Sequence, residues 1–162
     1  MSHILVSIMM GSKNDLSVME DTLKTFKEFG VGYEAKVLSA HRTPKETVEY
    51  AEKLKSRGIK VVICGAGASA ALAGTVAAHS DLPVLGVPID ATCFHGWDAL
   101  LSTVQMPPGI PVASLAVGKM GARNAALFAL RILALQDDRL ADKLVAFKEE
   151  QRKTILDTKI EL

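Results

Sequence analysis

Aromatic side chains are scarce in this chain. Only 5% of its 162 residues are Phe, Trp or Tyr, although 49% are hydrophobic. The core is therefore expected to be aliphatic and rich in alanine, with closely packed helices. The formal net charge is also small, at +1, so no broad electrostatic field indicates a nucleic acid or an anionic membrane as a partner.

Cysteines and long hydrophobic runs are scarce as well. Cys64 and Cys93 have neither a CxxC spacing nor neighbours typical of a zinc site, and no other spacing of His, Asp, Glu and Cys predicts a metal site. The apolar stretch 3–10 is too short for a signal peptide or a membrane span. These absences predict a cytoplasmic protein in a reducing compartment, with no metal.

Apolar runs alternate with segments of helical period along the whole chain, whose length fits one domain over residues 1–162. Five strands, each followed by a helix, predict an α/β fold with a doubly wound parallel sheet in the flavodoxin-like order 2-1-3-4-5. The expected strands are Ile4–Met10, Tyr33–Leu38, Lys60–Cys64, a strand within Pro83–Pro88, and Pro111–Val117.

The last segment, residues 139–158, has the pattern of a charged amphipathic helix that projects beyond the final α/β unit. One domain has little surface left to cover its apolar stripe, so we expect it to pack on a neighbouring subunit. The alanine- and glycine-rich helices at 66–78 and 122–135 also suit close approach between subunits, and together these features favour a homo-oligomer. Docking within its own chain is the alternative.

The loop after the first strand offers groups that bind hydroxyls and phosphate. Gly11 permits a tight turn, and Ser12 with the following backbone N–H groups lies near a helix start, which attracts phosphate. Asp15 repels phosphate but accepts hydrogen bonds from ribose hydroxyls. Helix capping by Ser12 or Asp15 is the alternative role. The loop is neither GxGxxG nor a P-loop, so dinucleotides and nucleoside triphosphates gain little support.

The loop after the second strand, Ser39–Pro44, places an imidazole beside a guanidinium. His41 can give and take a proton within one turnover because imidazole titrates near neutral pH. Arg42 can hold a phosphate or carboxylate through two hydrogen bonds, and Ser39 can donate to the same anion. The alternative is a helix-capping Ser or Thr, a surface Arg and a hydrogen-bonded His.

Both loops follow strands of one parallel sheet, whose carboxyl ends are where such folds bind ligands. We therefore expect one pocket for a phosphorylated, hydroxyl-bearing small molecule. A third loop, Gly65–Gly74, offers bare backbone to a flat ring or a carboxylate, or else only packs a helix closely on a strand. A fourth candidate wall is Ile89–Trp97, in which His95 is more readily explained as a surface or capping group than as a ligand.

At this point the chain resembles the PurE family, which includes N5-carboxyaminoimidazole ribonucleotide mutase and the related aminoimidazole ribonucleotide carboxylase of purine synthesis. The similarity extends over nearly the whole chain. It is carried by the Met-Gly-Ser-x-x-Asp loop, Ser39-Ala40-His41-Arg42-Thr43-Pro44, Gly65-Ala66-Gly67, Gln105-Met106-Pro107, Gly109-Ile110-Pro111-Val112-Ala113 and Asn124-Ala125-Ala126-Leu127, in that order.

The resemblance implies a flavodoxin-like subunit in a cytoplasmic homo-octamer, with sites at subunit contacts and no metal or organic cofactor. It implies an aminoimidazole ribonucleotide and CO2 as the small-molecule partners, and His41 as the general acid/base. It excludes nucleic acid and membranes. The substrate-binding residues that it implies are Ser12, Asp15, Ser39, Arg42, Gly67, Ala68 and Leu72.

Two segments depart from the pattern of the mutases that the chain resembles. Their usual loop has His where this chain has Ala71 and Pro where it has Ala73, and residues 91–97 also differ. The mutase is the leading hypothesis. The alternatives are a carboxylase that uses CO2 directly and a diverged, non-catalytic protein that binds a phosphoribosyl ligand. A flavin protein or a response regulator is disfavoured, because the chain lacks an aromatic pair for a flavin and an acidic cluster after the first strand.

Overall fold

A computed structural model describes residues 3–160, which fall into two compact units divided between residues 129 and 130. Helix α5 runs across that boundary. The elements in chain order are β1 (Ile4–Met10), a short 3-10 turn η1 (Lys13–Asp15), α1 (Leu16–Phe29), β2 (Gly32–Val37), α2 (Pro44–Lys53), β3 (Val61–Gly67), α3 (Leu72–Ala78), β4 (Val84–Ile89), α4 (Trp97–Val104), β5 (Ala113–Ser114), α5 (Lys119–Ala134) and α6 (Asp138–Asp157).

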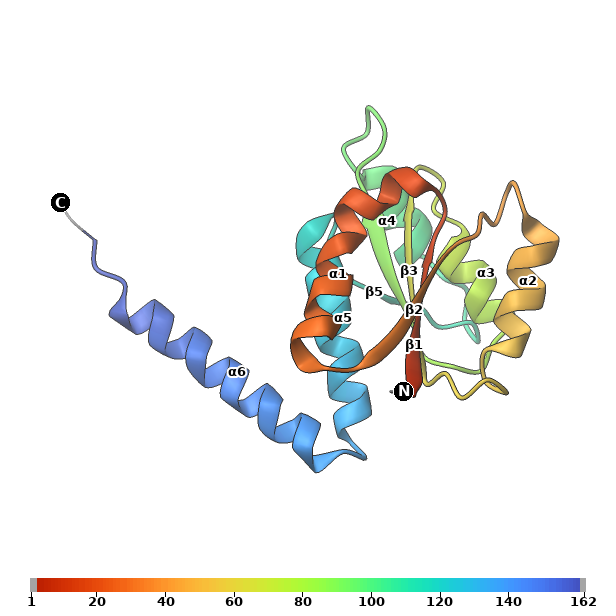
Figure 1. The fold of residues 1–162 in the computed structure, drawn as a ribbon. Helices are drawn as coiled ribbons and strands as arrows, with labels where there is room; N and C mark the ends of the chain where they lie inside the picture. Colours follow the sequence, from red (N-terminus) through yellow and green to blue (C-terminus); the bar gives the residue numbers. More distant parts are fainter. Residues whose placement is uncertain (1–2, 161–162) are drawn as a thin grey trace. The chain divides into compact units, whose positions relative to one another are not determined.

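The first unit is built on five parallel strands in the order β2-β1-β3-β4-β5, which confirms the predicted sheet. In Figure 1, α1 lies on one face of the sheet, and α2 and α3 lie on the other. Strands β1, β3 and β4 are buried on both faces, which explains their near-continuous apolar sequences. The core is aliphatic, as the composition predicts; its largest fully buried side chains include Phe26, Ile8, Met9, Met19, Leu54 and Ile63.

Helices pack closely on this sheet through small residues. A Cβ at Gly65 would lie 2.5 Å from the sulfur of Met19, so only glycine lets α1 approach β3 at that point. On the same side, the Thr22 hydroxyl donates to the Ala122 carbonyl at 2.8 Å and ties α1 to the start of α5. This packing holds α1, and with it the loop before α1, firmly against the carboxyl end of β3.

Most predicted strand ends differ from the structure by at most one residue, but two strands differ by more. Strand β3 continues past Cys64 to Gly67, because residues 65–67 keep their pairing with β4, and the helix that follows starts only at Leu72. Strand β5 is limited to Ala113–Ser114, although seven residues were expected. Pro111 has no N–H to donate to a ladder, which is typical of the edge of a sheet.

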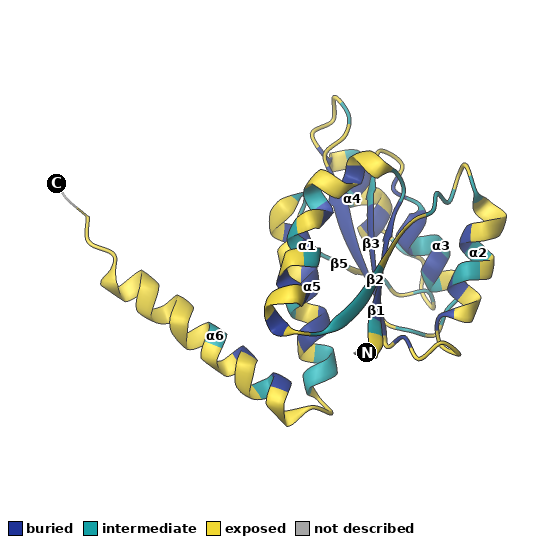
Figure 2. Cartoon of the chain, viewed as in Figure 1, coloured by how far each residue is buried: buried dark blue, intermediate teal, exposed yellow. Residues whose placement is uncertain are grey.

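The second unit holds the end of α5 and helix α6. The Asp137 carboxylate accepts the Leu140 N–H at 3.1 Å and caps α6 at its first turn. Most of α6 is exposed, including Val145, Ile155 and Leu156 (Figure 2). Its packing on a neighbouring subunit stays a prediction. Within residues 3–160, no helix is both long and apolar enough to cross a membrane.

Candidate active site

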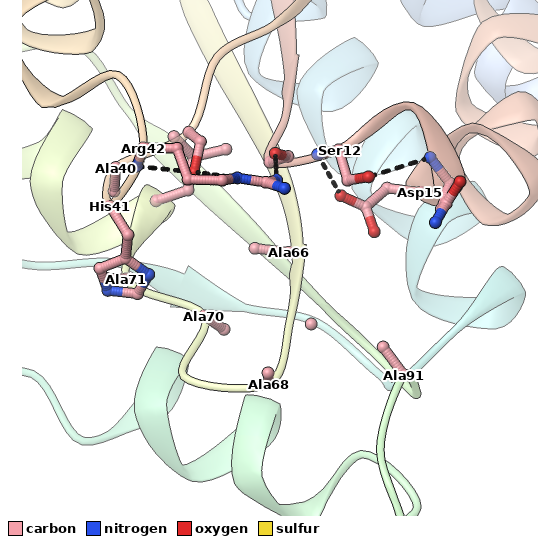
Figure 3. A pocket seen from close by; sticks show the side chains of 15 residues that line it. Ser12, Asp15, Ala40, His41, Arg42, Ala66, Ala68, Ala70, Ala71 and Ala91 are labelled. Carbon is pink, nitrogen blue, oxygen red and sulfur yellow. Dashed lines mark hydrogen bonds between the residues drawn. The ribbon is translucent and has the colours of Figure 1, made fainter.

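One cavity of about 380 Å³ brings together every residue that the sequence predicts for the site. It opens at the carboxyl ends of β1, β2 and β3, where an open parallel sheet is expected to bind its ligand. Figure 3 shows its lining. The eight predicted residues that line it are Ser12, Asp15, Ser39, His41, Arg42, Gly67, Ala68 and Leu72.

The loop after β1 is held by a capping box. The Ser12 hydroxyl accepts the Asn14 N–H at 3.2 Å, and the Asp15 carboxylate accepts the Ser12 N–H at 2.8 Å. The alternative capping role is therefore real, and it coexists with a place in the cavity wall. Because both side chains are fixed before any ligand arrives, this wall is preorganised.

Asp15 is nearly buried, with 7% of its surface exposed. Burial raises the pKa of the Asp15 carboxyl above its ordinary value; the Ser12 N–H, Arg42 and the Gly11 N–H oppose the rise without cancelling it. The Asp15 carboxylate lines the cavity and accepts one hydrogen bond from the Ser12 N–H, so it can also accept one from a ligand hydroxyl.

Arg42 connects the two predicted loops. Its Nη2 donates to the Gly11 carbonyl at 2.6 Å, and its Nε donates to the Ser39 hydroxyl at 3.3 Å (Figure 3). The side chain is exposed and has no carboxylate as a hydrogen-bond partner among residues 3–160. Because both hydrogen bonds of this side chain go to neutral oxygens, the guanidinium can still form an ion pair with an anionic ligand.

His41 is exposed at the apex of the second loop. Figure 3 draws no hydrogen bond to its ring, and among residues 3–160 no carboxylate or carbonyl orients it. The hydrogen-bonded histidine of the alternative is therefore not found within these residues, and the role of His41 stays a prediction. Within the described residues 3–160, His41 is the only histidine that lines this cavity, so proton transfer by an imidazole there would use His41.

The third loop forms a small, apolar wall opposite the polar loops. A Cβ at Gly67 would lie 2.7 Å from that of Ala91, so the wall has no room for a larger residue there. Ala68 has a φ of 54°, in the left-handed region that most side chains avoid. Leu72 is buried, and Ala71 contributes only a methyl group where the related mutases are expected to carry an imidazole.

Sequence reasoning missed several small residues of this lining. Ala91 belongs to the fourth candidate wall, whereas His95 and Trp97, which drew attention to that segment, do not line the cavity. Small residues carry no chemical signal of their own, so only the strand-end position of their loops could have indicated them. The lining residues not assigned to substrate are Gly11, Asn14, Ala40, Ala66, Ala70, Ala71 and Ala91.

A second cavity, of about 610 Å³, is larger but is a weaker candidate. Its polar side chains already contact one another: the Lys55 amine lies 3.1 Å from the Asp81 carboxylate, and the His79 ring lies 3.6 Å from the Glu52 carboxylate. It contains none of the predicted site residues. In the part of the chain from 3 to 160, no three metal-ligating side chains lie together in either cavity or elsewhere.

Comparisons with known proteins agree with the geometry. The model of the AIR carboxylase family matches residues 5–154. The chain is 50% identical to N5-carboxyaminoimidazole ribonucleotide mutase of Saccharolobus solfataricus, over 96% of this chain and 98% of the relative. It is 48% identical to the protein of that name in Bacillus subtilis, over 98% of each chain. The crystal structure of Treponema denticola PurE superposes with a TM-score of 0.86 at 32% identity, covering 94% of each chain.

Proposed function

Because the chain belongs to the AIR carboxylase family, we propose that it is an N5-carboxyaminoimidazole ribonucleotide mutase of purine synthesis. The single observation that carries this proposal is the meeting of one imidazole, one guanidinium and one buried carboxylate in a cavity whose other walls are small and apolar. That set can hold a phosphorylated sugar and move a proton. A cavity of about 380 Å³ is within the range of small-molecule sites.

The polar loops would hold the ribonucleotide. Arg42 and the Ser12 hydroxyl would donate to the phosphate, with Ser39 beside them, and Asp15 would accept from the ribose hydroxyls. The fixed capping box at Ser12 and Asp15 supports this assignment, since it orients both side chains before binding. The imidazole ring of the substrate would then face Gly67, Ala68 and Leu72.

His41 would carry both proton transfers of the rearrangement. In its protonated form it donates to the carbamate nitrogen as the bond from that nitrogen to the carboxyl carbon breaks, which releases CO2 and leaves His41 neutral. The enamine-like C4 of the substrate attacks CO2 and forms the new carbon–carbon bond. Neutral His41 then removes the C4 proton and returns to its starting state, so the cycle balances without ATP or a metal ion.

Ala71 places a methyl group, and not a second imidazole, in the cavity wall. Within residues 3–160, His41 is the one imidazole in the lining, so we assign both the carbamate nitrogen and C4 to this ring in turn. The apolar wall formed by Ala68, Ala70, Ala71 and Ala91 supports retention of CO2 between the two steps, because CO2 is itself apolar.

We also propose that the protein works as a homo-octamer in the cytoplasm. The exposed apolar side chains of α4 and α6, among them Trp97, Leu101 and Ile155, support burial against further copies. The two free cysteines support a reducing compartment. Light scattering at several concentrations tests the assembly, for which eight times the 17.3 kDa chain mass is the expected result.

A spectrophotometric assay of the purified protein tests the function. The protein is offered N5-carboxyaminoimidazole ribonucleotide, and separately aminoimidazole ribonucleotide with bicarbonate, each with and without ATP. Turnover of the first substrate without ATP is expected. Turnover of only the second substrate indicates the carboxylase alternative. Inactivity on both, with the ribonucleotide still bound, indicates the non-catalytic alternative.

A further inference from the structure

Thr43 lies at the N-cap position of α2 but does not cap that helix. Threonine is a preferred N-cap residue because its hydroxyl can accept an N–H from the first turn. Here the hydroxyl makes no such bond, and Pro44 follows as the first helical residue. Helix α2 therefore forgoes a stabilising contact that its own sequence could supply. Departures of this kind, in which a residue breaks a local rule, are expected at functional sites.

The Thr43 hydroxyl is turned back onto the loop instead. It accepts the Ser39 N–H at 2.9 Å and donates to the Ser39 carbonyl at 3.1 Å, while the Thr43 N–H donates to the same carbonyl at 2.9 Å. Three hydrogen bonds thus join the first and last residues of the segment 39–43. The segment becomes a closed ring of backbone with His41 at its centre.

His41 depends on this ring more than its neighbour does. Arg42 has one anchor outside the ring, because its Nη2 donates to the Gly11 carbonyl, whereas its Nε and its backbone N–H donate to the Ser39 hydroxyl within the ring. The His41 ring has no hydrogen bond of its own among the described residues. Its position is therefore set by the backbone that carries it.

We propose that Thr43 is a positioning residue, whose hydroxyl supplies two of the three hydrogen bonds that close the 39–43 loop and thereby fixes the His41 imidazole over the substrate. This inference rests on the proposed function for its catalytic consequence. The loop closure itself is a property of the free protein. Thr43 is not among the residues that line the cavity, so it acts through His41.

Two variants separate this role from general stabilisation. Thr43→Val keeps the shape of the side chain but removes the hydroxyl, and Thr43→Ser keeps the hydroxyl. Thr25→Val is the matched control, because the Thr25 hydroxyl also donates to a backbone carbonyl, that of Asp21 at 2.8 Å, but within α1 and outside the cavity wall.

In the mutase assay, kcat of Thr43→Val is expected to fall about tenfold to a hundredfold, because a misplaced catalytic group costs that much. KM is expected to change far less, since Arg42 keeps its hydrogen bond to the Gly11 carbonyl, which lies outside the ring. Thr43→Ser and Thr25→Val are expected to keep the kcat of the unmodified protein. A wild-type kcat in Thr43→Val, or an equal loss in Thr25→Val, overturns the proposal.

Amide hydrogen exchange measured by mass spectrometry tests the loop closure without any substrate. The peptide that spans residues 39–43 is expected to exchange faster in Thr43→Val, and at the wild-type rate in Thr43→Ser and Thr25→Val. Unchanged exchange in Thr43→Val overturns the proposal whatever the activity. Because this readout needs no turnover, its failure is distinct from a failure of the proposed function, which the unmodified protein reveals in the activity assay.

Discussion

Asp15 is a buried carboxylate and Glu34 a partly buried one, and each has an arginine nearby, yet the shifts of their pKa values have opposite signs. Around Glu34, the partners are complete: Tyr50 donates to it at 2.5 Å, and Arg57 forms an ion pair with it. Burial alone would raise the pKa of Glu34, but the hydrogen bonds from Tyr50 and Arg57 prevail and lower it. Around Asp15, burial prevails and raises the pKa.

The use of the two arginines explains this difference. Arg57 faces its carboxylate and lies over the Tyr50 ring, 5.4 Å from its centroid. Arg42 instead donates to a carbonyl and a hydroxyl. The Glu34 cluster is thus closed by the fold, whereas the Asp15 cluster is left open for a ligand. Perturbed and incompletely partnered groups gather at functional sites for this reason.

The two clusters are expected to differ in which property a substitution changes. Substitutions in the cavity are expected to change turnover or ligand affinity with little effect on stability. Substitutions in the Glu34 cluster are expected to change stability with little effect on turnover. The predictions below test that division, from the largest expected effect on turnover to the smallest.

His41→Asn is expected to lower kcat by about 10²- to 10⁴-fold, the usual contribution of a general acid/base. Its unfolding free energy is expected to stay within about 0.5 kcal/mol of the unmodified protein, because an exposed ring without partners stabilises nothing. Steady-state kinetics and urea unfolding measure the two quantities. His79→Asn, which alters an exposed ion pair outside this cavity, is the control and is expected to keep full activity.

Arg42→Lys is expected to raise KM about ten- to a hundredfold, since a charged hydrogen bond is worth about 1.5–3 kcal/mol and lysine cannot reproduce the planar guanidinium. Isothermal titration calorimetry with the product measures the affinity directly. The same substitution in the other cluster, Arg57→Lys, is the control. If Arg57→Lys weakens the affinity as much as Arg42→Lys does, the division between the clusters fails.

Asp15→Asn is expected to raise KM about tenfold, the value of one hydrogen bond, without loss of stability. A carboxyl whose folded-state pKa is raised contributes stability at low pH that is lost as the pH rises through that pKa. Relative to the unmodified protein, the variant is therefore expected to gain stability as the pH rises from 4 to 8. Urea unfolding at several pH values checks this sign, and a loss above about 1 kcal/mol at neutral pH contradicts it.

Glu34→Gln is expected to leave kcat unchanged and to lower the unfolding free energy by about 0.2–1 kcal/mol at neutral pH, because it leaves Arg57 without its ion pair at a site that solvent partly screens. The pKa of Glu34 is lowered, so its stabilisation is present above the unfolded-state pKa and is lost as the pH falls through the folded-state value. The difference between variant and parent should therefore shrink in acid. A difference that stays constant down to pH 3 would show that the charge of Glu34 contributes nothing.

Local patterns were enough to predict the sheet and the place of the site. The apolar run Ile4–Met10 is the whole of β1, and both polar loops follow strands, so their meeting at one edge follows from parallel topology. The extension of β3 through Gly67 could not be predicted in this way. Its Gly-Ala-Gly sequence has no strand preference, and it is extended because it pairs with β4.

The polar clusters depend on packing between distant segments, which no local pattern records. Tyr50 and Glu34 are 16 residues apart on different elements, and neither carried a sequence signal. For the second loop, helix capping by a Ser or Thr was the alternative, and it is wrong for Thr43, whose hydroxyl bonds Ser39 instead. The general chemistry of the loops is thus readable from residue types, whereas the orientation of each group is not.

The most direct test of the account is the conversion of N5-carboxyaminoimidazole ribonucleotide in a buffer free of ATP and added bicarbonate, with the unmodified protein and His41→Asn side by side. The account predicts that the unmodified protein forms the 4-carboxy product and that the variant binds the ribonucleotide but does not convert it. Equal conversion by both proteins would contradict the role of His41 as the acid/base. No conversion by the unmodified protein would contradict the mutase itself.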